Sequence, residues 1–585
     1  MRLTITDFTR GLWLVGGKET AVKGWMRRLR GAHELRTPSL RSRNGSLELA
    51  TTNAVVAIAP QLGGFYYYAT NTNSEADVTL YRSGTSIYSG VGDGRLTRQF
   101  LVNTNQSGTE DWLYFMTQSG GAKKVESGTT TVYRWGIAAP AAAPTLADGG
   151  AGAMAAGTYK YFVVFVNGNT GARSNPNLNA ASITQAVNRQ VNLTNIPVSG
   201  DTQVTQREIY RTVANGARYF RAAVINNNTA TTLTDNTVDA NLSSIEVQFD
   251  NLDPNDFGIS TAWKTNDRRI WWTSQLYPYY GNAFYSPPGR PESVRGFIVV
   301  GGLQNESLVA GFTWGGANWV FSTQRLYRIF GEDEPFVSLP IDGVPGLTLE
   351  TALAVTPYGV AFISYNGVYI FDGARAQLLG FDELSPIFSG EVVENIEDTL
   401  GFALSLTTSS LCYANEQLFL FSYTGDAPCL VYNFRTQSWR DLGLNVLAMT
   451  KNSTTRSIFA SFNDNLYELE KQGELEDGTT PITIEWEVAC GLSAVAHYGT
   501  VQRVYLDVKT SSETLTVELV VDETVISLGT AITSTRQLVE FPVPSGWQAR
   551  VFSVRLTGSV SARVELFGVS VDVKLEGANT DQGVG

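Results

Sequence analysis

The chain has 585 residues, 56 of them glycine, and a formal net charge of −12 at pH 7. The acidic balance argues against broad nonspecific affinity for nucleic acid or anionic membranes, although it leaves room for a channel through which DNA merely passes. Only 17% of the residues are charged, 11% are aromatic, and long runs of helix-forming residues are scarce. This composition is typical of a globular, mainly β protein with many turns.

The N-terminal residues carry charges every few positions and lack the apolar core of a secretory signal. No run approaches the roughly 18 apolar residues of a membrane-spanning helix, so we expect no membrane span. The three cysteines, Cys412, Cys429 and Cys490, are odd in number and lack metal-ligand spacing. We expect reduced structural thiols in a protein made in a cytosol.

Residues 1–52 are expected to form a first strand and a basic arm. The stretch "KGWMRRLRGAHELRTPSLRSRNGS" (23–46) is locally basic, and its arginines are Arg27, Arg28, Arg30, Arg36, Arg41 and Arg43. Such an arm can bind nucleic acid or an acidic partner surface. The alternative is a surface segment that pairs with acidic groups of its own fold.

Residues 53–137 and 249–480 are expected to build a β-propeller. In "SYNGVYIFDG" (364–373), Asn-Gly and Asp-Gly turns flank a run of β-branched and aromatic residues, as in a β-hairpin. Similar "apolar-Tyr-x-apolar" strands start at Val132, Leu326, Val431 and Leu466. Their spacing scatters around that of four-stranded blades, which indicates about six or seven blades. The simpler alternative is a β-rich protein with tyrosines scattered at alternating positions.

Residues 138–248 interrupt this pattern. "AAPAAAPTLADGGAGAMAAG" (138–157) has almost no charge and is expected to be a linker. In the following strand, Tyr159, Tyr161, Val163 and Phe165 should share one face. Further strands at regular spacing and the lack of a cysteine pair indicate an inserted fibronectin-III-like β-sandwich rather than a disulfide-bonded immunoglobulin domain.

Residues 481–585 alternate strictly between apolar and polar positions, for example in "TLTVELVVD" and "RVELFGVSVDVKL". This pattern predicts a second β-sandwich at the C-terminus, with the last ten residues frayed.

Catalytic patterns are weak throughout the chain. His33 and His497 are the only histidines, and neither lies in a metal-binding or nucleophile motif. "GEDEP" (331–335) clusters Glu332, Asp333 and Glu334, which we interpret as a solvated loop rather than a catalytic pair. "GVGDG" and "GGAGAMAAG" do not match a phosphate-binding loop.

Tryptophan pairs offer one further candidate site. Trp271 with Trp272, and Trp314 with Trp319, could form carbohydrate-binding platforms, but in strands they are more often core. We therefore expect no enzymatic activity, no catalytic residues, no cofactor and no metal.

Several segments in order resemble the nozzle, or tail tubular B-type, proteins of short-tailed bacteriophages, also described as DNA-stabilisation proteins. They are "GLW" before an arginine-rich segment ending in "LRSRNGS", then "LYRIFGEDEPF", "TPYGVAFISYNGVYIFDGARAQLL" and "LVYNFRTQSW". The insert, with "GTYKYFVVFVNGNTGARSNP" and "REIYRT", looks like the fibronectin-type modules of phage tail proteins. The resemblance extends to about residue 470.

The resemblance implies a virion tail protein, made in the host cytoplasm, that forms a homo-hexameric ring below the portal and adaptor. Such a ring extends the DNA channel, retains packaged DNA, guides its ejection without sequence-specific binding, and docks fibres or spikes. The basic arm would contact the adaptor. A carbohydrate-binding or carbohydrate-cleaving propeller, acting in receptor recognition or as a depolymerase, is the first alternative. A secreted adhesin is the second.

Overall fold

The structure is a computed structural model. It describes residues 1–10, 26–33, 39–51, 55–60, 62, 64–65, 67–71, 77–91, 96–104, 108, 111–126, 129–301, 306–379, 405–425, 427–452, 455–491, 499–521, 524–545, 547–549 and 551–575. The chain divides into two compact units. Unit 1 comprises Met1–Pro60 and Leu347–Gly585, and unit 2 comprises Gln61–Gly346.

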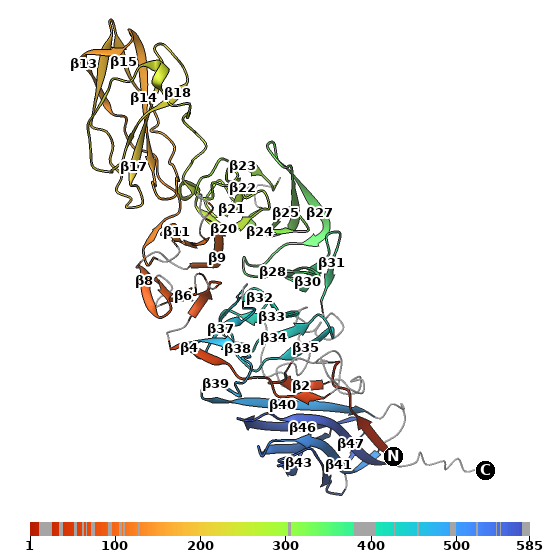
Figure 1. Ribbon diagram of the computed structural model, residues 1–585. Helices are drawn as coiled ribbons and strands as arrows, with labels where there is room; N and C mark the ends of the chain where they lie inside the picture. Colours follow the sequence, from red (N-terminus) through yellow and green to blue (C-terminus); the bar gives the residue numbers. More distant parts are fainter. Residues whose placement is uncertain are drawn as a thin grey trace, which may run out of the picture. The chain divides into compact units, whose positions relative to one another are not determined.

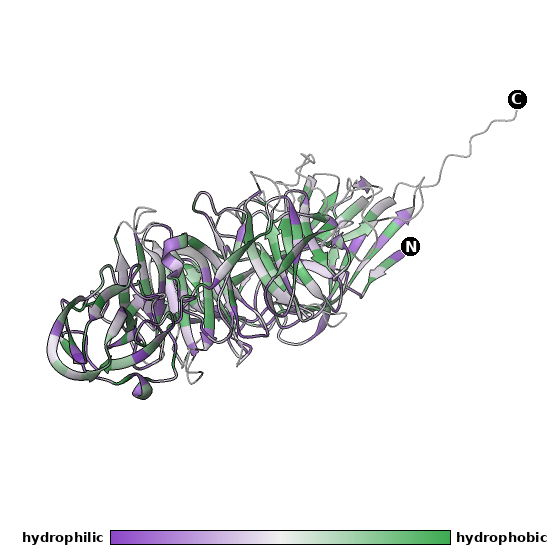
Figure 2. Ribbon diagram, turned by 90° about the horizontal axis from the view of Figure 1, so that it is seen from above, coloured by the Kyte–Doolittle hydropathy of each residue, from purple (hydrophilic) through white to green (hydrophobic). Residues whose placement is uncertain are grey.

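The expectation of a mainly β protein is confirmed. The described residues form strands throughout, and their only helices are two short 3-10 turns, η2 (Asp239–Asn241) and η3 (Pro254–Phe257). No helix in this part of the chain is long and apolar enough to cross a membrane. Hydrophobic residues run along the strands, and hydrophilic residues are more frequent in the connecting loops (Figure 2).

Unit 2 is built largely from antiparallel sheets whose strands follow one another in chain order. The first strands are β6 (Tyr67–Asn71), β7 (Val78–Arg82) and β8 (Thr85–Gly90). Three four-stranded sheets follow: β9 (Leu96–Thr104), β10 (Asp111–Thr117), β11 (Gly121–Val125) and β12 (Val132–Arg134); β20 (Ile259–Lys264), β21 (Ile270–Ser274), β22 (Asn282–Tyr285) and β23 (Gly296–Val299); β24 (Leu308–Trp314), β25 (Ala317–Ser322), β26 (Arg325–Phe330) and β27 (Val337–Pro345). This is the strand order of propeller blades.

Successive four-stranded sheets of unit 2 share apolar cores. Trp112 and Tyr114 on β10 pack in one cluster with Ile270 and Trp272 on β21, around the fully buried Trp135. The opposite side of the second sheet, with Trp271, packs against Val320 and Tyr327 of the third. Both faces of β21 are buried, because Ile270 and Trp272 enter one core and Trp271 enters the other.

The insert consists of two sheets around a common core (Figure 1). One sheet pairs β13, β16 and β19, and the other pairs β15, β14, β17 and β18. Tyr159, Tyr161 and Val163 on β14 enter the shared core together with Val191 on β16. The strands are β13 (Thr145–Met154), β14 (Gly157–Val166), β15 (Ala181–Gln185), β16 (Arg189–Thr194), β17 (Gln206–Thr212), β18 (Tyr219–Ile225) and β19 (Leu233–Asp235).

The expected linker at 138–157 is wrong for half of its length, because residues 145–154 form strand β13. The small residues fit a crowded and irregular pairing: the β13–β16 register shifts near Ala151, and a Cβ added to Gly152 would lie 2.4 Å from the Gln190 backbone nitrogen. The glycine and alanine content therefore reflects close approach of backbones rather than flexibility.

Polar contacts join the insert to the sheets of unit 2. The Gln203 side-chain amide donates to the carbonyl oxygens of Arg134 and Gly136, at 3.1 and 2.9 Å. Asp253 accepts a 2.8 Å hydrogen bond from Arg134, and the Asn255 side chain donates to the Trp135 carbonyl at 2.7 Å. These bonds satisfy the backbone at the point where the chain leaves β12 and returns through η3.

Unit 1 contains three further four-stranded arrangements. The first comprises β28 (Leu353–Thr356), β29 (Gly359–Ser364), β30 (Gly367–Phe371) and β31 (Ala376–Leu378), and the second β32 (Ser409–Ala414), β33 (Gln417–Ser422), β34 (Leu430–Asn433) and β35 (Ser438–Asp441). The third comprises β36 (Ala448–Lys451), β37 (Ile458–Phe462) and β38 (Asn465–Leu469), with the N-terminal strand β4 (Leu47–Thr51) as its outer strand. Strand β5 (Val55–Ile58) lies against β36 and β37.

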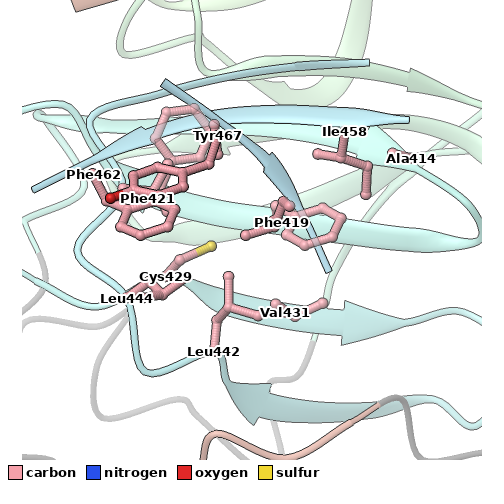
Figure 3. Packing of buried hydrophobic residues seen from close by; sticks show 13 residues of the cluster. Ala414, Phe419, Phe421, Cys429, Val431, Leu442, Leu444, Ile458, Phe462 and Tyr467 are labelled. Carbon is pink, nitrogen blue, oxygen red and sulfur yellow. The ribbon is translucent and has the colours of Figure 1, made fainter. Parts of the chain in front are cut away.

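The hairpin expected at "SYNGVYIFDG" is β29–β30, closed by the pair Ser364–Gly367. Gly367 has φ of 140°, which glycine adopts readily. Between the second and third arrangements, Phe419 and Val431 pack against Ile458 and Tyr467, and the Cys429 thiol points into the same core (Figure 3). Truncation of one large side chain here, such as Phe419→Ala, is expected to cost about 3–5 kcal/mol.

The C-terminal strands of unit 1 pair with N-terminal ones (Figure 1). One sheet contains β1 (Arg2–Ile5), β3 (Leu40–Arg41), β41 (Gly499–Lys509), β44 (Gln537–Pro542), β45 (Gln548–Ala549) and β47 (Glu565–Leu575). The other strands are β39 (Glu476–Asp477), β40 (Thr480–Gly491), β42 (Leu515–Val521), β43 (Thr524–Ala531) and β46 (Val551–Val560). Strand β2 (Met26–Arg30) lies between β35 and β40, so these strands join β32–β35 in one ten-stranded sheet.

Candidate interaction surfaces

The described arginines of the expected basic arm lie on β2, on β3 and two residues beyond the end of β3. Strand β2 contains Arg27, Arg28 and Arg30, while Arg41 ends β3 and Arg43 follows it. Arg36 and the side chain of Arg27 lie outside the described residues.

Arg28 binds two carboxylates of β40, the strand beside it. Its Nη1 lies 2.5 Å from Glu485 Oε1, and its Nε lies 3.4 Å from Glu487 Oε2. Strand β2 pairs antiparallel with β40, with Leu29 opposite Trp486. Side chains from neighbouring strands therefore meet on one face, and the charge of Arg28 is matched within the sheet.

Arg41 and Arg43 also bind acidic groups of unit 1. Arg41 Nε lies 2.9 Å from Glu565 Oε1. Arg43 is 2% exposed, and its guanidinium binds Asp477, with Nη1 at 2.9 Å from Oδ1. In the structure, Arg28, Arg41 and Arg43 each pair with a carboxylate of the protein's own fold. Contact of the arm with an adaptor remains a prediction.

Two buried carboxylates near the arm have shifted pKa values of opposite sign. Burial raises the pKa of Asp441 to about 6, although the Gly443 N–H and Arg30 act in the opposite direction. Burial also acts to raise the pKa of Glu470, but Arg440 and His33 outweigh it and lower that pKa to about 2. Arg440 lies 3.1 Å and His33 3.8 Å from the carboxylate.

The expected acidic loop is an ion-paired turn between β26 and β27. Asp333 binds Arg269 at 2.8 Å, and Glu334 binds Arg295 at 2.6 Å. Glu332 is exposed. The described residues contain no group of three or more His, Cys, Asp or Glu side chains arranged to hold a metal ion. Of the two histidines, His33 lies near Glu470, and His497 lies outside the described residues.

The tryptophan pairs are mostly core. Trp271, Trp272 and Trp319 are buried, and Trp314 is half-buried with its carbonyl accepting from the Trp319 indole. The core alternative is therefore correct for the three buried rings, which cannot serve as carbohydrate platforms.

A surface not expected from the sequence lies on unit 2, along the outer strands β23 and β27 and the β21–β22 connection. We call it the apolar rim. Its exposed side chains are Tyr277, Tyr280, Phe297, Val299, Val337 and Leu339.

The apolar rim is continuous because its segments contact one another. The Tyr277 and Tyr280 ring centroids are 6.3 Å apart, and the Phe297 ring lies 6.3 Å from that of Tyr279. The Ser338 hydroxyl reaches the Val299 carbonyl oxygen at 3.4 Å, which brings β27 beside β23. None of the six side chains carries a charge. Exposed apolar patches of this kind mark surfaces for contact with other proteins.

One feature of the sequence points to the apolar rim. The run "FIVV" (297–300) ends an expected blade, yet both of its faces are apolar: Ile298 packs against the core, while Phe297 and Val299 face outward. An outer strand with an apolar face toward water is unusual, because edge strands are normally protected by charge or proline.

No model of a known protein family matches the chain, and no curated protein matches it. Solved structures share only a distant likeness. BamB from Moraxella catarrhalis is 11% identical with a TM-score of 0.33, covering 74% of this chain and 99% of its own. The C-terminal WD40 domain of Sif2 is 9% identical with a TM-score of 0.28, covering 73% and 98%. Scores of this size support no conclusion about function.

Proposed function

We propose that the protein is a structural component of a bacteriophage tail, a nozzle protein that forms a ring-shaped conduit for DNA below the portal and adaptor. The observation that carries the proposal is the apolar rim, an uncharged exposed surface on outer strands of blade-type sheets. Its uncharged side chains suit another protein surface rather than nucleic acid. The proposal also rests on the resemblance of the chain to nozzle proteins.

The fold proposed for this role is a β-propeller of about six or seven blades. Strand β4 supports it, because an N-terminal strand completes a sheet whose other strands lie near residue 460, as expected of a chain that closes on itself. The insert, with two sheets around one core, is proposed to be a fibronectin-III-like sandwich. The C-terminal strands are proposed to form a second sandwich.

The proposed partners are further copies of this chain, in a homo-hexamer, together with an adaptor protein and a tail fibre or spike. A closed ring needs two different surfaces on each copy, because the contact is head-to-tail. We assign the apolar rim to one of these surfaces, facing a second copy. The protein is proposed to act in the virion tail and to have no enzymatic activity, and DNA is proposed to pass through the ring without sequence-specific binding.

The rim proposal is tested by analytical ultracentrifugation of the purified protein. We expect wild type to form ring-sized assemblies, and Val337→Lys/Leu339→Lys to remain monomeric, because two buried charges oppose contact at the rim. Val525→Lys/Leu538→Lys, which changes exposed apolar residues of the C-terminal strands, is the matched control and should assemble. Assembly of the rim variant at wild-type concentration would contradict the assignment.

A carbohydrate-binding propeller is the second candidate. It is favoured by Tyr277, which is 78% exposed, and by its neighbour Tyr280, since exposed aromatic rings can stack on sugars. A glycan-array screen of wild type and Tyr277→Ala separates the two functions. Binding to host polysaccharide that is lost in Tyr277→Ala would favour this candidate over the conduit.

A further inference from the structure

A second exposed surface lies on unit 1, at the ends of the strands of three neighbouring sheets. We call it the turn surface. Two of its side chains, Tyr413 and Lys451, lie on β32 and β36, and the others lie in the turns β28–β29, β34–β35 and β36–β37. Its residues are Tyr358, Tyr413, Phe434, Arg435, Lys451 and Arg456.

The turn surface is held together by ring contacts and backbone hydrogen bonds. Phe434 stacks on Tyr358 with centroids 4.7 Å apart, and meets Tyr413 edge-on at 5.8 Å. The Phe434 N–H donates to the Glu416 carbonyl at 3.0 Å. The Asn415 side chain donates to the Arg456 carbonyl at 3.1 Å. These contacts fix the turns relative to one another.

The cations of the turn surface differ from most arginines of the chain. Arg435, Lys451 and Arg456 form no ion pair with any carboxylate in the described part of the chain, although Lys451 Nζ lies 5.7 Å from the centroid of the Tyr413 ring. Other exposed arginines are paired, for example Arg503 with Glu540 and Arg536 with Asp507.

The turn surface is therefore positive within an acidic chain. Two carboxylates lie near these turns: Glu416, in the β32–β33 turn, and Glu468, which accepts a hydrogen bond from Ser457 and is ion-paired with Lys471. This leaves Glu416 against three cations. The chain as a whole has a net charge of −12. Three cations without ion pairs at neighbouring strand ends therefore form a distinct electrostatic feature. Because the turn surface is positive, a partner of complementary charge is an anion.

We propose that the turn surface contacts the phosphate backbone of double-stranded DNA. The cations are divided between two hairpins, with Arg435 on β34–β35 and both Lys451 and Arg456 on β36–β37, and do not surround a pocket. This arrangement suits a row of phosphates better than one small anion. Tyr413 and Phe434 are half-buried, and Phe434 stacks on one face of Tyr358, which is 48% exposed. The three rings therefore do not offer a series of free faces on which successive unpaired bases could stack. The contact would be independent of sequence and weak for each copy, as a duplex that must slide requires.

The choice of DNA as the partner rests on the proposed function as a conduit. The turn surface itself is defined only by its residues, their contacts and their charges. An acidic protein is the other class of anionic partner. Protein interfaces usually centre on fully covered aromatic anchors that enter a pocket of the partner. Here the aromatic rings contact one another and none is free to enter a partner's pocket alone, while Arg435 and Arg456 are exposed, which favours phosphate.

The test is fluorescence anisotropy of a labelled short DNA duplex with full-length protein, from about 50 to 200 mM salt. Three phosphate contacts predict a slope of log K against log salt of about −2.7. In Arg435→Gln/Lys451→Gln/Arg456→Gln the slope should approach zero, and affinity at low salt should fall by about tenfold or more. The matched control is Arg218→Gln/Arg503→Gln/Arg536→Gln, which removes the same charge from ion-paired exposed sites and should keep the wild-type slope.

Equal losses in both triple variants would overturn the proposal, because binding would then follow net charge alone. Failure of wild type to bind the duplex, with binding to polyglutamate instead, would also overturn it in favour of an acidic protein partner. Sedimentation of the same samples separates the two proposals. A monomeric wild type whose DNA binding depends on the three cations would contradict the ring and support the proposed role of the turn surface. A ring whose DNA binding does not depend on these cations would support the ring and contradict the role of the turn surface.

Discussion

Arg43 and Asp477 form a buried ion pair although 434 positions separate them in the chain. The guanidinium also donates to the Leu442 carbonyl at 3.0 Å, so Arg43 links the N-terminal segment to β39 and to the residue after β35. The most basic stretch of the sequence thus contributes one of its charges to the interior of unit 1.

Loss of the Arg43 side chain should destabilise unit 1 strongly. Arg43→Gln leaves the Asp477 carboxylate buried without its cation, and we expect a cost of about 3–5 kcal/mol in the free energy of unfolding. Arg41→Gln is the control, because its pair with Glu565 is partly exposed and should contribute about 1 kcal/mol or less. Urea unfolding followed by tryptophan fluorescence measures both, and equal stabilities of the two variants would contradict the structural role of Arg43.

Lys124 and Glu292 form the corresponding pair in unit 2. Both side chains are essentially unexposed, Nζ lies 2.7 Å from Oε2, and the ammonium lies 4.5 Å from the Trp112 ring. We expect Lys124→Met to cost about 3–5 kcal/mol and Lys124→Met/Glu292→Met to recover most of that loss. A double variant as unstable as the single one, in a thermal unfolding series, would show that the pair itself is needed.

Asp441 should make stability depend on pH. Its pKa is about 6 in the folded protein, above its ordinary value of 3.8, so the folded state holds the proton more tightly than the unfolded state does. The contribution of Asp441 to stability is therefore greatest below about pH 4 and is lost as pH rises through 6. Asp441→Asn mimics the protonated form and keeps an acceptor for the Gly443 N–H.

The Asn variant should therefore gain stability relative to wild type between about pH 4 and 7, by up to about 3 kcal/mol. Melting temperatures of both proteins across this range measure the gain. A constant difference between them at every pH would contradict the raised pKa.

The cysteines should be unreactive in the folded protein. Burial raises the pKa of the Cys412 thiol to about 12 and that of Cys429 well above its usual range, and Cys490 is buried in β40. Thiolates are the reactive species, so an aromatic disulfide reagent at pH 8 should modify none of the three thiols before unfolding and all of them in denaturant. Rapid modification of Cys429 or Cys490 in native protein would contradict their burial, and rapid modification of the half-buried Cys412 would contradict its raised pKa.

Local turn chemistry explains which elements could be predicted from the sequence. Asn366-Gly367 predicts the β29–β30 hairpin, because the turn and both strands lie within about fifteen residues and need no distant partner. Tyr159, Tyr161 and Val163 were likewise predictable as one buried face of β14 from their alternation alone.

Pairings between distant segments could not be predicted in this way. The charge of Arg28 and Arg43 suggested a solvent-exposed arm, but their partners Glu487 and Asp477 lie more than 400 residues away, where no local pattern connects them. Strand β13 could not be predicted for a related reason. Its glycines are required by the close approach of β16, a contact that the local sequence does not reveal. The turn surface also depends on which turns become neighbours, as Tyr358 and Phe434 do.

Cryo-electron microscopy of the native assembly tests the conduit most directly. Particles that contain this protein would be isolated from a native lysate by sedimentation and then imaged. The account predicts that the protein travels with large DNA-filled particles and forms a six-fold ring on the tail axis. A small soluble species, or trimers at the periphery of the particle, would contradict the conduit and favour glycan recognition instead.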